Sequence, residues 1–181
     1  MLVGIGLGLQ QTFNDLISGI ILLFERSVEV GNVVELNGGM IGTVRRIGLR
    51  TSLIETRENI SVIVPNSKLI TDIVTNWSHN DDKARFLIQI GVAYGTDTQL
   101  VKKLLLKIAR DNVYVLSNPG PTVRFTNFGD SSLDFNLIFW SRNFLVIEDI
   151  KSDLRFEINQ VFLDNKINIP FPQRDVWIRK E

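Results

Sequence analysis

The first 25 residues constrain the fold more than any other part of this 181-residue chain. The run from Leu2 to Leu9 has no polar side chain, yet a helix needs ~20 mostly apolar residues to span a bilayer. No basic segment precedes the run and no small-residue cleavage site follows it, so it does not resemble a secretory signal. Gly4 and Gly8 share one helical face, a spacing that lets helices pack tightly in a membrane. The glycines therefore indicate close approach of another backbone.

Apolar side chains recur at helical spacing over the next segment, from Thr12 to Phe24. The stripe consists of Phe13, Leu16, Ile17, Ile20, Ile21 and Phe24, and the residues off it are Thr12, Asn14, Asp15 and Ser18. Such a helix can lie along a membrane surface or pack on a partner. An ordinary helix with its apolar face toward the core fits the same period.

Composition argues against several classes of function. Lys plus Arg (20) equals Asp plus Glu (20), so no net charge attracts nucleic acid. With no cysteine there is no disulfide or thiolate chemistry, and the single histidine, His79, builds neither a histidine metal site nor a conventional triad. The acidic candidates, none at ligand-type spacing, are Asp97, Asp111, Asp130, Asp134, Glu148 and Asp149. We expect no catalytic residues, no metal site, no cofactor and no enzyme activity.

Beyond residue 31 the pattern changes to short β-rich runs at 32–36, 40–48, 51–56, 60–64 and 72–77. The segments 37–39 and 57–59 are typical of turns. Five short strands predict a small barrel or rolled sheet. Five basic side chains lie here: Arg45, Arg46, Arg50, Arg57 and Lys68. They lack interleaved aromatics, so they indicate a solvated face rather than a nucleic-acid surface.

The second half predicts an α/β unit after a polar linker at residues 78–83. A strand from Phe86, a helix that starts with a capping box at Thr96 and Gln99, two strands and a long helix give the order β-α-β-β-α. This order predicts a ferredoxin-like sheet with two helices on one face, and hence an α+β chain. The tail from Ile167 contains two prolines and is expected to be extended, without a local partner strand.

Five stretches of the sequence carry a family resemblance. They read "GLGLQQTFNDLISGIILLFERSVEVGNVVEL", "GTVRRIGLRTSLIETRENISVIVPNSKLI", "NWS", "IGVAYGTD" and "INIPFPQRDV". They lie in order and span nearly the entire chain. In them the chain resembles the small-conductance mechanosensitive channel (MscS) family, over its last transmembrane helix and its cytoplasmic portion. We therefore expect a fragment that lacks the preceding membrane helices.

The resemblance implies roles for residues in the first helix. Val3 and Leu7 fall where the family places two constricting apolar rings, and Gly4 and Gly8 would be the faces on which neighbouring pore helices slide. A second group would bend the helix: Gln10, Gln11 and, as an alternative kink, Gly19. Some family members have glycine where this chain has Gln11. The helix from Thr12 to Phe24 would lie under the bilayer and connect the gate to the cage.

The resemblance also implies an assembly and an activity. Seven copies would form a pore and a hollow cytoplasmic cage, closed by a barrel of C-terminal strands made from Asp175, Val176, Trp177, Ile178 and Arg179. The implied domains are a pore and membrane-surface helix (1–27), an Sm-like β domain (28–78), a ferredoxin-like domain (79–168) and an oligomerisation strand (169–181). Membrane tension would open the pore and release ions and small solutes from swelling cells. The partners would be lipids of a bacterial inner membrane, with most of the chain on the cytoplasmic side.

A second hypothesis is a soluble module, an Sm-like barrel fused to a ferredoxin-like domain, which binds RNA or protein. Its support is the fold type and the five basic residues of the β segment. The neutral charge balance and the apolar N-terminus argue against it, and a salt-dependent RNA-binding assay separates the two hypotheses.

Overall fold

A computed structural model describes residues 2–79, 82–174 and 176–177, with side-chain surroundings from residue 7 onward. The chain forms two compact units. The first contains Met1–Ala84 together with Phe144–Val146, and the second contains Arg85–Asn143 together with Ile147–Glu181. The expected α+β class, with an N-terminal helix and antiparallel sheets, is confirmed. Each unit is described by itself.

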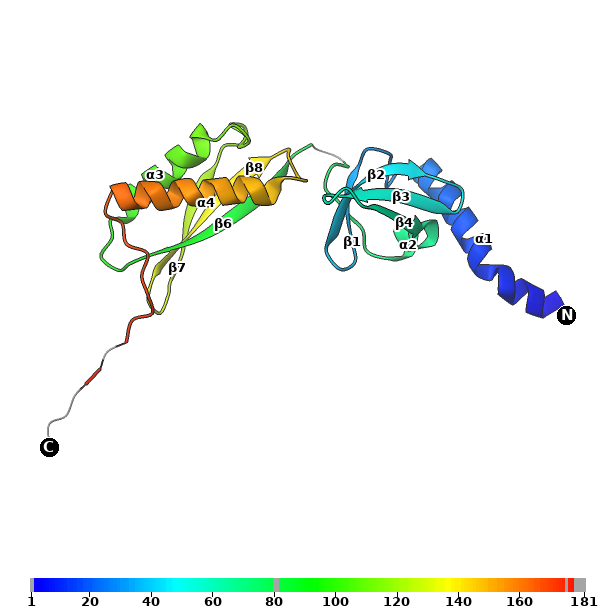
Figure 1. The fold of residues 1–181 in the computed structure, drawn as a ribbon, viewed down its shortest axis with the longest axis horizontal. Coiled ribbons are helices and arrows are strands. Elements are labelled where there is room, and N and C mark those ends of the chain that lie inside the picture. The colour runs from blue at the N-terminus through cyan, green and yellow to red at the C-terminus, as the bar shows by residue number, and fades with distance from the viewer. Residues whose placement is uncertain (1, 80–81, 175, 178–181) are drawn as a thin grey trace. The chain divides into compact units, whose positions relative to one another are not determined.

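The first unit is a five-stranded antiparallel sheet with two helices (Figure 1). Its elements are α1 (Leu2–Glu25), β1 (Val33–Leu36), β2 (Met40–Ile47), β3 (Thr51–Thr56), β4 (Ser61–Pro65), α2 (Asn66–Thr71) and β5 (Thr75–Asn76). The strand order is β4-β3-β2-β1-β5, with a bulge in β2 between Val44 and Arg46. Leu22 of α1 packs into the sheet's core beside Val34, Val44 and Ile54, all of them almost fully buried. The last part of α1 is thus anchored in this unit.

The second unit has the β-α-β-β-α order that the sequence predicts. Its elements are β6 (Ala84–Val92), α3 (Thr98–Asp111), β7 (Thr122–Phe128), β8 (Leu133–Ser141) and α4 (Ile147–Asp164). The sheet order is β6-β8-β7, and α3 and α4 pack on one face of it around Leu105, Phe139 and Leu154 (Figure 1). Alternate residues of β6 and β8 point into this core, as the two-residue period requires.

Two local predictions are wrong. The N-cap of α3 is Asp97, whose carboxylate accepts hydrogen bonds from the backbone N–H groups of Gln99 and Leu100. The hydroxyl of Thr96 instead donates to the carbonyl of Ala93, so Thr96 does not start a capping box. The other error is α2, which begins directly after Pro65 where the sequence predicts only the end of a strand.

Candidate functional site

The N-terminal half of α1 extends beyond the sheet of the first unit (Figure 1). Leu7 is 68% exposed, and a Cβ added at Gly8 would meet nothing within 4 Å. Both residues therefore lie on an open surface of the helix. Val3 and Gly4 lie in the helix, but their side-chain surroundings fall outside the described part.

The polar side of α1 makes the contact with α2. Asp15 is 6% exposed, and its Oδ1 accepts a hydrogen bond of 2.6 Å from the hydroxyl of Ser67 and one of 3.4 Å from the Ser67 N–H. The amide of Gln11 donates to the same carboxylate oxygen at 3.4 Å and to the Ser67 hydroxyl at 3.1 Å. No side chain within α2 caps its first turn, so Asp15 provides that acceptor from another helix.

One helical turn further along, α1 lies so close to the rest of the first unit that only glycine fits. A Cβ on Gly19 would lie 2.4 Å from the carbonyl oxygen of Leu49 and 2.5 Å from Nδ2 of Asn66. Asn66 is fully buried, donating to the carbonyls of Gly48 and Leu49 at 2.9 and 3.0 Å and accepting from the Ser52 hydroxyl at 2.8 Å. Gly19 therefore packs against Leu49 and Asn66, which hydrogen bonds hold in place. We call this contact, together with the Asp15–Ser67 hydrogen bonds, the α1–α2 interface.

The apolar stripe of α1 faces away from the unit. Phe13, Ile17, Ile20 and Phe24 are 50–84% exposed, whereas Asp15 and Ser18 are buried. The core-facing alternative is therefore wrong for most of this stripe: apart from Leu22, which packs into the core, the helix buries small and polar residues and exposes much of its apolar side. Residues 7–25 are long and apolar enough to cross a membrane by length and composition. An exposed apolar face of this kind is typical of a membrane or protein interaction site.

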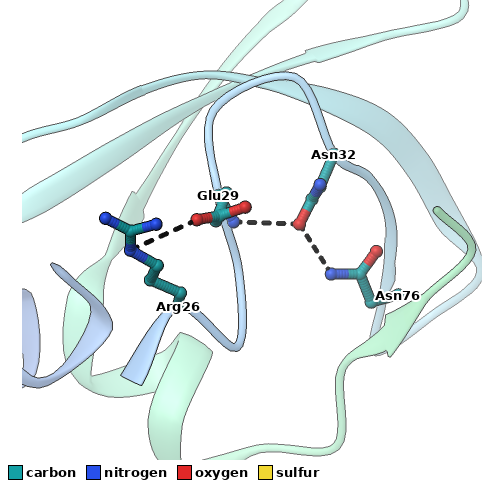
Figure 2. Close-up of polar contacts among 4 residues, drawn as sticks. All are labelled: Arg26, Glu29, Asn32 and Asn76. Carbon is teal, nitrogen blue, oxygen red and sulfur yellow. Dashed lines mark hydrogen bonds and ion pairs between the residues drawn. The ribbon is translucent and has the colours of Figure 1, made fainter. Parts of the chain in front are cut away.

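A polar cluster holds the segment after α1 against β5 (Figure 2). Arg26 ends the helix with a positive φ of 54° and forms an ion pair with Glu29 at 3.6 Å. The Oδ1 of Asn32 accepts from the Glu29 N–H at 2.9 Å and from Nδ2 of Asn76 at 2.8 Å. The same Asn76 amide donates to the carbonyl of Ser27 at 3.1 Å. The end of α1 is therefore tied to the last strand of its unit.

The helix is continuous through the residues that the resemblance assigns to bending. Gln10 and Gln11 lie inside α1, and so does Gly19. Gln10 is exposed, while Gln11 reaches the α1–α2 interface described above. A hinge at these positions stays a prediction.

Residues 168–174 of the C-terminal tail form neither helix nor strand. Val176 and Trp177 are 80% and 92% exposed, whereas Asp175, Ile178 and Arg179 lie outside the described residues. A strand shared between chains therefore stays a prediction.

Among residues 2–79, 82–174 and 176–177, no three His, Cys, Asp or Glu side chains gather where they could hold a metal ion. Arg45, one of the five basic residues of the β segment, forms an ion pair with Glu55. This pairing supports the interpretation of a solvated face.

Two family models match this chain in sequence order. The mechanosensitive ion channel β-domain matches residues 11–79, and the C-terminal domain of the mechanosensitive ion channel MscS matches residues 86–169. Together they cover both units and most of α1. The chain belongs to the MscS family of mechanosensitive ion channels.

Relatives in this family align over almost the whole chain. An uncharacterized MscS family protein of Haemophilus influenzae is 40% identical over 98% of this chain and 16% of its own length. The mechanosensitive channel MscK of Escherichia coli is 40% identical over 99% of this chain and 16% of its own length. The crystal structure of Helicobacter pylori MscS in a closed state covers 99% of this chain and 70% of that one, with 25% identity and a TM-score of 0.86. This chain thus spans a small fraction of the first two relatives.

Sequence reasoning missed the residues that hold α1 in place. The sequence pattern places Asp15 and Ser18 only off the apolar stripe, and it places Asn66 in no predicted element. A signal was present: a carboxylate within an otherwise apolar helix needs a partner when it is buried. The partner, Ser67, lies 52 residues further along the chain, so spacing alone could not identify it.

Proposed function

We propose that this chain is part of one subunit of a tension-gated channel in a bacterial inner membrane, with most of the chain on the cytoplasmic side. The observation that carries the proposal is the orientation of α1. The helix buries Asp15 and Gly19 against its own unit and exposes its apolar stripe, which in this account contacts lipid and neighbouring subunits. Family membership supports the same assignment.

The gate in this proposal is an apolar constriction that excludes water. Val3 and Leu7 of each subunit form two apolar rings around a narrow pore, and water leaves such a constriction, so ions cannot pass. Gly4 and Gly8 let neighbouring helices approach closely and slide. Tension favours the conformation with the larger area in the membrane plane, and therefore shifts the equilibrium toward the open state. Ions and small solutes then leave the swollen cell.

The α1–α2 interface transmits movement of the gate to the sheet of the first unit. Hydrogen bonds from Ser67 to Asp15 and the close contact of Gly19 with Leu49 join the helix to the sheet at two levels, one turn apart. Movement of α1 in response to tension must therefore either move the sheet of the first unit with it or break these contacts. Seven copies, with their C-terminal strands paired in a barrel, complete the proposed assembly.

The test is a pair of serine substitutions in the full-length protein. Leu7→Ser places a hydroxyl in the proposed ring and should ease its wetting, so patch-clamp recordings should show opening at lower tension and cells should grow poorly. Leu9→Ser is the matched control, because two residues along a helix turn the side chain about 200° away from the pore. An unchanged threshold for Leu7→Ser, or an equal fall for both variants, contradicts the placement of the gate.

A further inference from the structure

The tail after α4 is held at two points of the second unit. Ile167 is buried in the core, and the carbonyl of Asn168 accepts a hydrogen bond of 2.9 Å from the N–H of Ala93, one residue beyond β6. Further along, the N–H of Gln173 donates to the hydroxyl of Ser131 at 3.0 Å. Ser131 lies in the turn between β7 and β8, residues 129–132, so this bond joins segments 42 residues apart.

The turn that carries Ser131 is itself fixed. Tyr94 donates its hydroxyl to the carbonyl of Gly129 at 2.6 Å, and the Gly129 N–H donates to the carbonyl of Ser132 at 2.7 Å. The hydroxyl of Ser132 donates to Oδ1 of Asp134 at 2.6 Å. A Cβ on Gly129 would lie 2.9 Å from Oδ2 of Asp134 and 3.2 Å from the carbonyl oxygen of Ser132, so the turn is closely packed here. A turn held by these contacts presents the Ser131 hydroxyl in one place.

Between the two attachment points the tail is restricted in conformation but loosely packed. Pro170 and Pro172 limit φ and have no N–H to donate. An open groove of about 460 Å³ separates this part of the tail from the turn, with Gly91, Asp134 and Ile169 in its lining. The hydrogen bond from the Gln173 N–H to the Ser131 hydroxyl therefore fixes the far end of the described part of the tail.

We propose that the β7–β8 turn is a docking surface for the chain's own C-terminal tail, and that Ser131 is a positioning residue for assembly with further copies of this chain. The inference rests on the proposed function, in which C-terminal segments pair between subunits. Phe171, Val176 and Trp177 are more than three-quarters exposed, so their apolar side chains are available to another tail. A tail that is already attached to its own second unit loses less conformational freedom when it pairs with another tail. This smaller loss favours association.

The experiment compares Ser131→Ala with Ser131→Thr, which keeps the hydroxyl. Hydrogen exchange followed by mass spectrometry reports on peptides that contain Gln173, and analytical ultracentrifugation reports on the oligomer across a dilution series. In Ser131→Ala we expect exchange at Gln173 to rise about two- to fivefold, as for the loss of one exposed hydrogen bond, and the oligomer to dissociate at higher protein concentration. Ser131→Thr should match the parent in both, and circular dichroism should show the same folded content in all three.

The outcomes separate this inference from the function on which it rests. Unchanged exchange at Gln173 in Ser131→Ala overturns the docking surface. Faster exchange with an unchanged oligomer overturns the positioning role. If the parent chain is a monomer, the shared tail barrel is wrong, and the exchange data alone then decide whether the turn holds the tail.

Discussion

Replacing Gly19 by alanine tests whether α1 is packed tightly against the rest of the first unit. An added methyl group would lie 2.4 Å from the carbonyl oxygen of Leu49 and 2.5 Å from Nδ2 of Asn66. The carbonyl belongs to the backbone and Asn66 is held by three hydrogen bonds, so neither group can move cheaply. Overpacking of this kind costs about 1–3 kcal/mol, while alanine gains about 1 kcal/mol over glycine in helix propensity. We expect a net loss of up to about 2 kcal/mol in the free energy of unfolding of the first unit.

Gly8→Ala is the matched control, because it makes the same chemical change in the same helix where a Cβ meets nothing within 4 Å. It should leave stability unchanged or raise it by up to about 1 kcal/mol. The assay is urea unfolding in detergent, followed by the fluorescence of Trp77 in a background where Trp140 and Trp177 are phenylalanine. Equal stability of the two alanine variants would falsify the claim that Gly19 marks a close contact, and would favour a role as a kink.

Three further changes test other parts of the structure. Asp15→Ala leaves the buried hydroxyl of Ser67 without its acceptor and should lower the free energy of unfolding of the first unit in urea by about 1–3 kcal/mol. Asp15→Asn keeps an acceptor and should cost less. The reverse order of the two variants would contradict the Asp15–Ser67 contact. Asp97→Ala removes the N-cap of α3 and should lower the stability of the second unit by about 1 kcal/mol, measured by the fluorescence of Trp140, with the first unit unaffected. Deleting residues 175–179 should shift the oligomer to smaller species in sedimentation, and a truncated chain that sediments like the parent argues against a shared tail barrel.

Regular elements with a clear period could be predicted from the sequence. The alternation in β6 and β8 and the helical stripe of α4 agree with most of the buried positions, because one side of each element packs on a single core. The exceptions are Tyr94, which is exposed beyond the end of β6, and Val161, whose neighbour Phe162 is buried in its place. The same reasoning gave the β-α-β-β-α order of the second unit. Burial on one side leaves a regular mark in the sequence, which explains this success.

Contacts that join distant segments could not be predicted in this way. The helix α2 has six residues, and its first turn depends on Asp15 from α1, so its own sequence carries only a weak helical signal. The period of α1 identified its apolar stripe but not the face that meets the protein. That choice depends on what covers the stripe outside the chain, namely lipid or another subunit in our proposal. The N-cap of α3 was misplaced by one residue because Thr96 and Asp97 can both cap a helix.

The most direct measurement of the central claim is the current through the full-length protein reconstituted in liposomes, recorded while suction stretches a membrane patch. Our account predicts a current that is absent at rest, appears above a threshold of tension and disappears when the suction is released. Inserted protein that passes no current at any tension the patch survives, or the same current with and without suction, would contradict it.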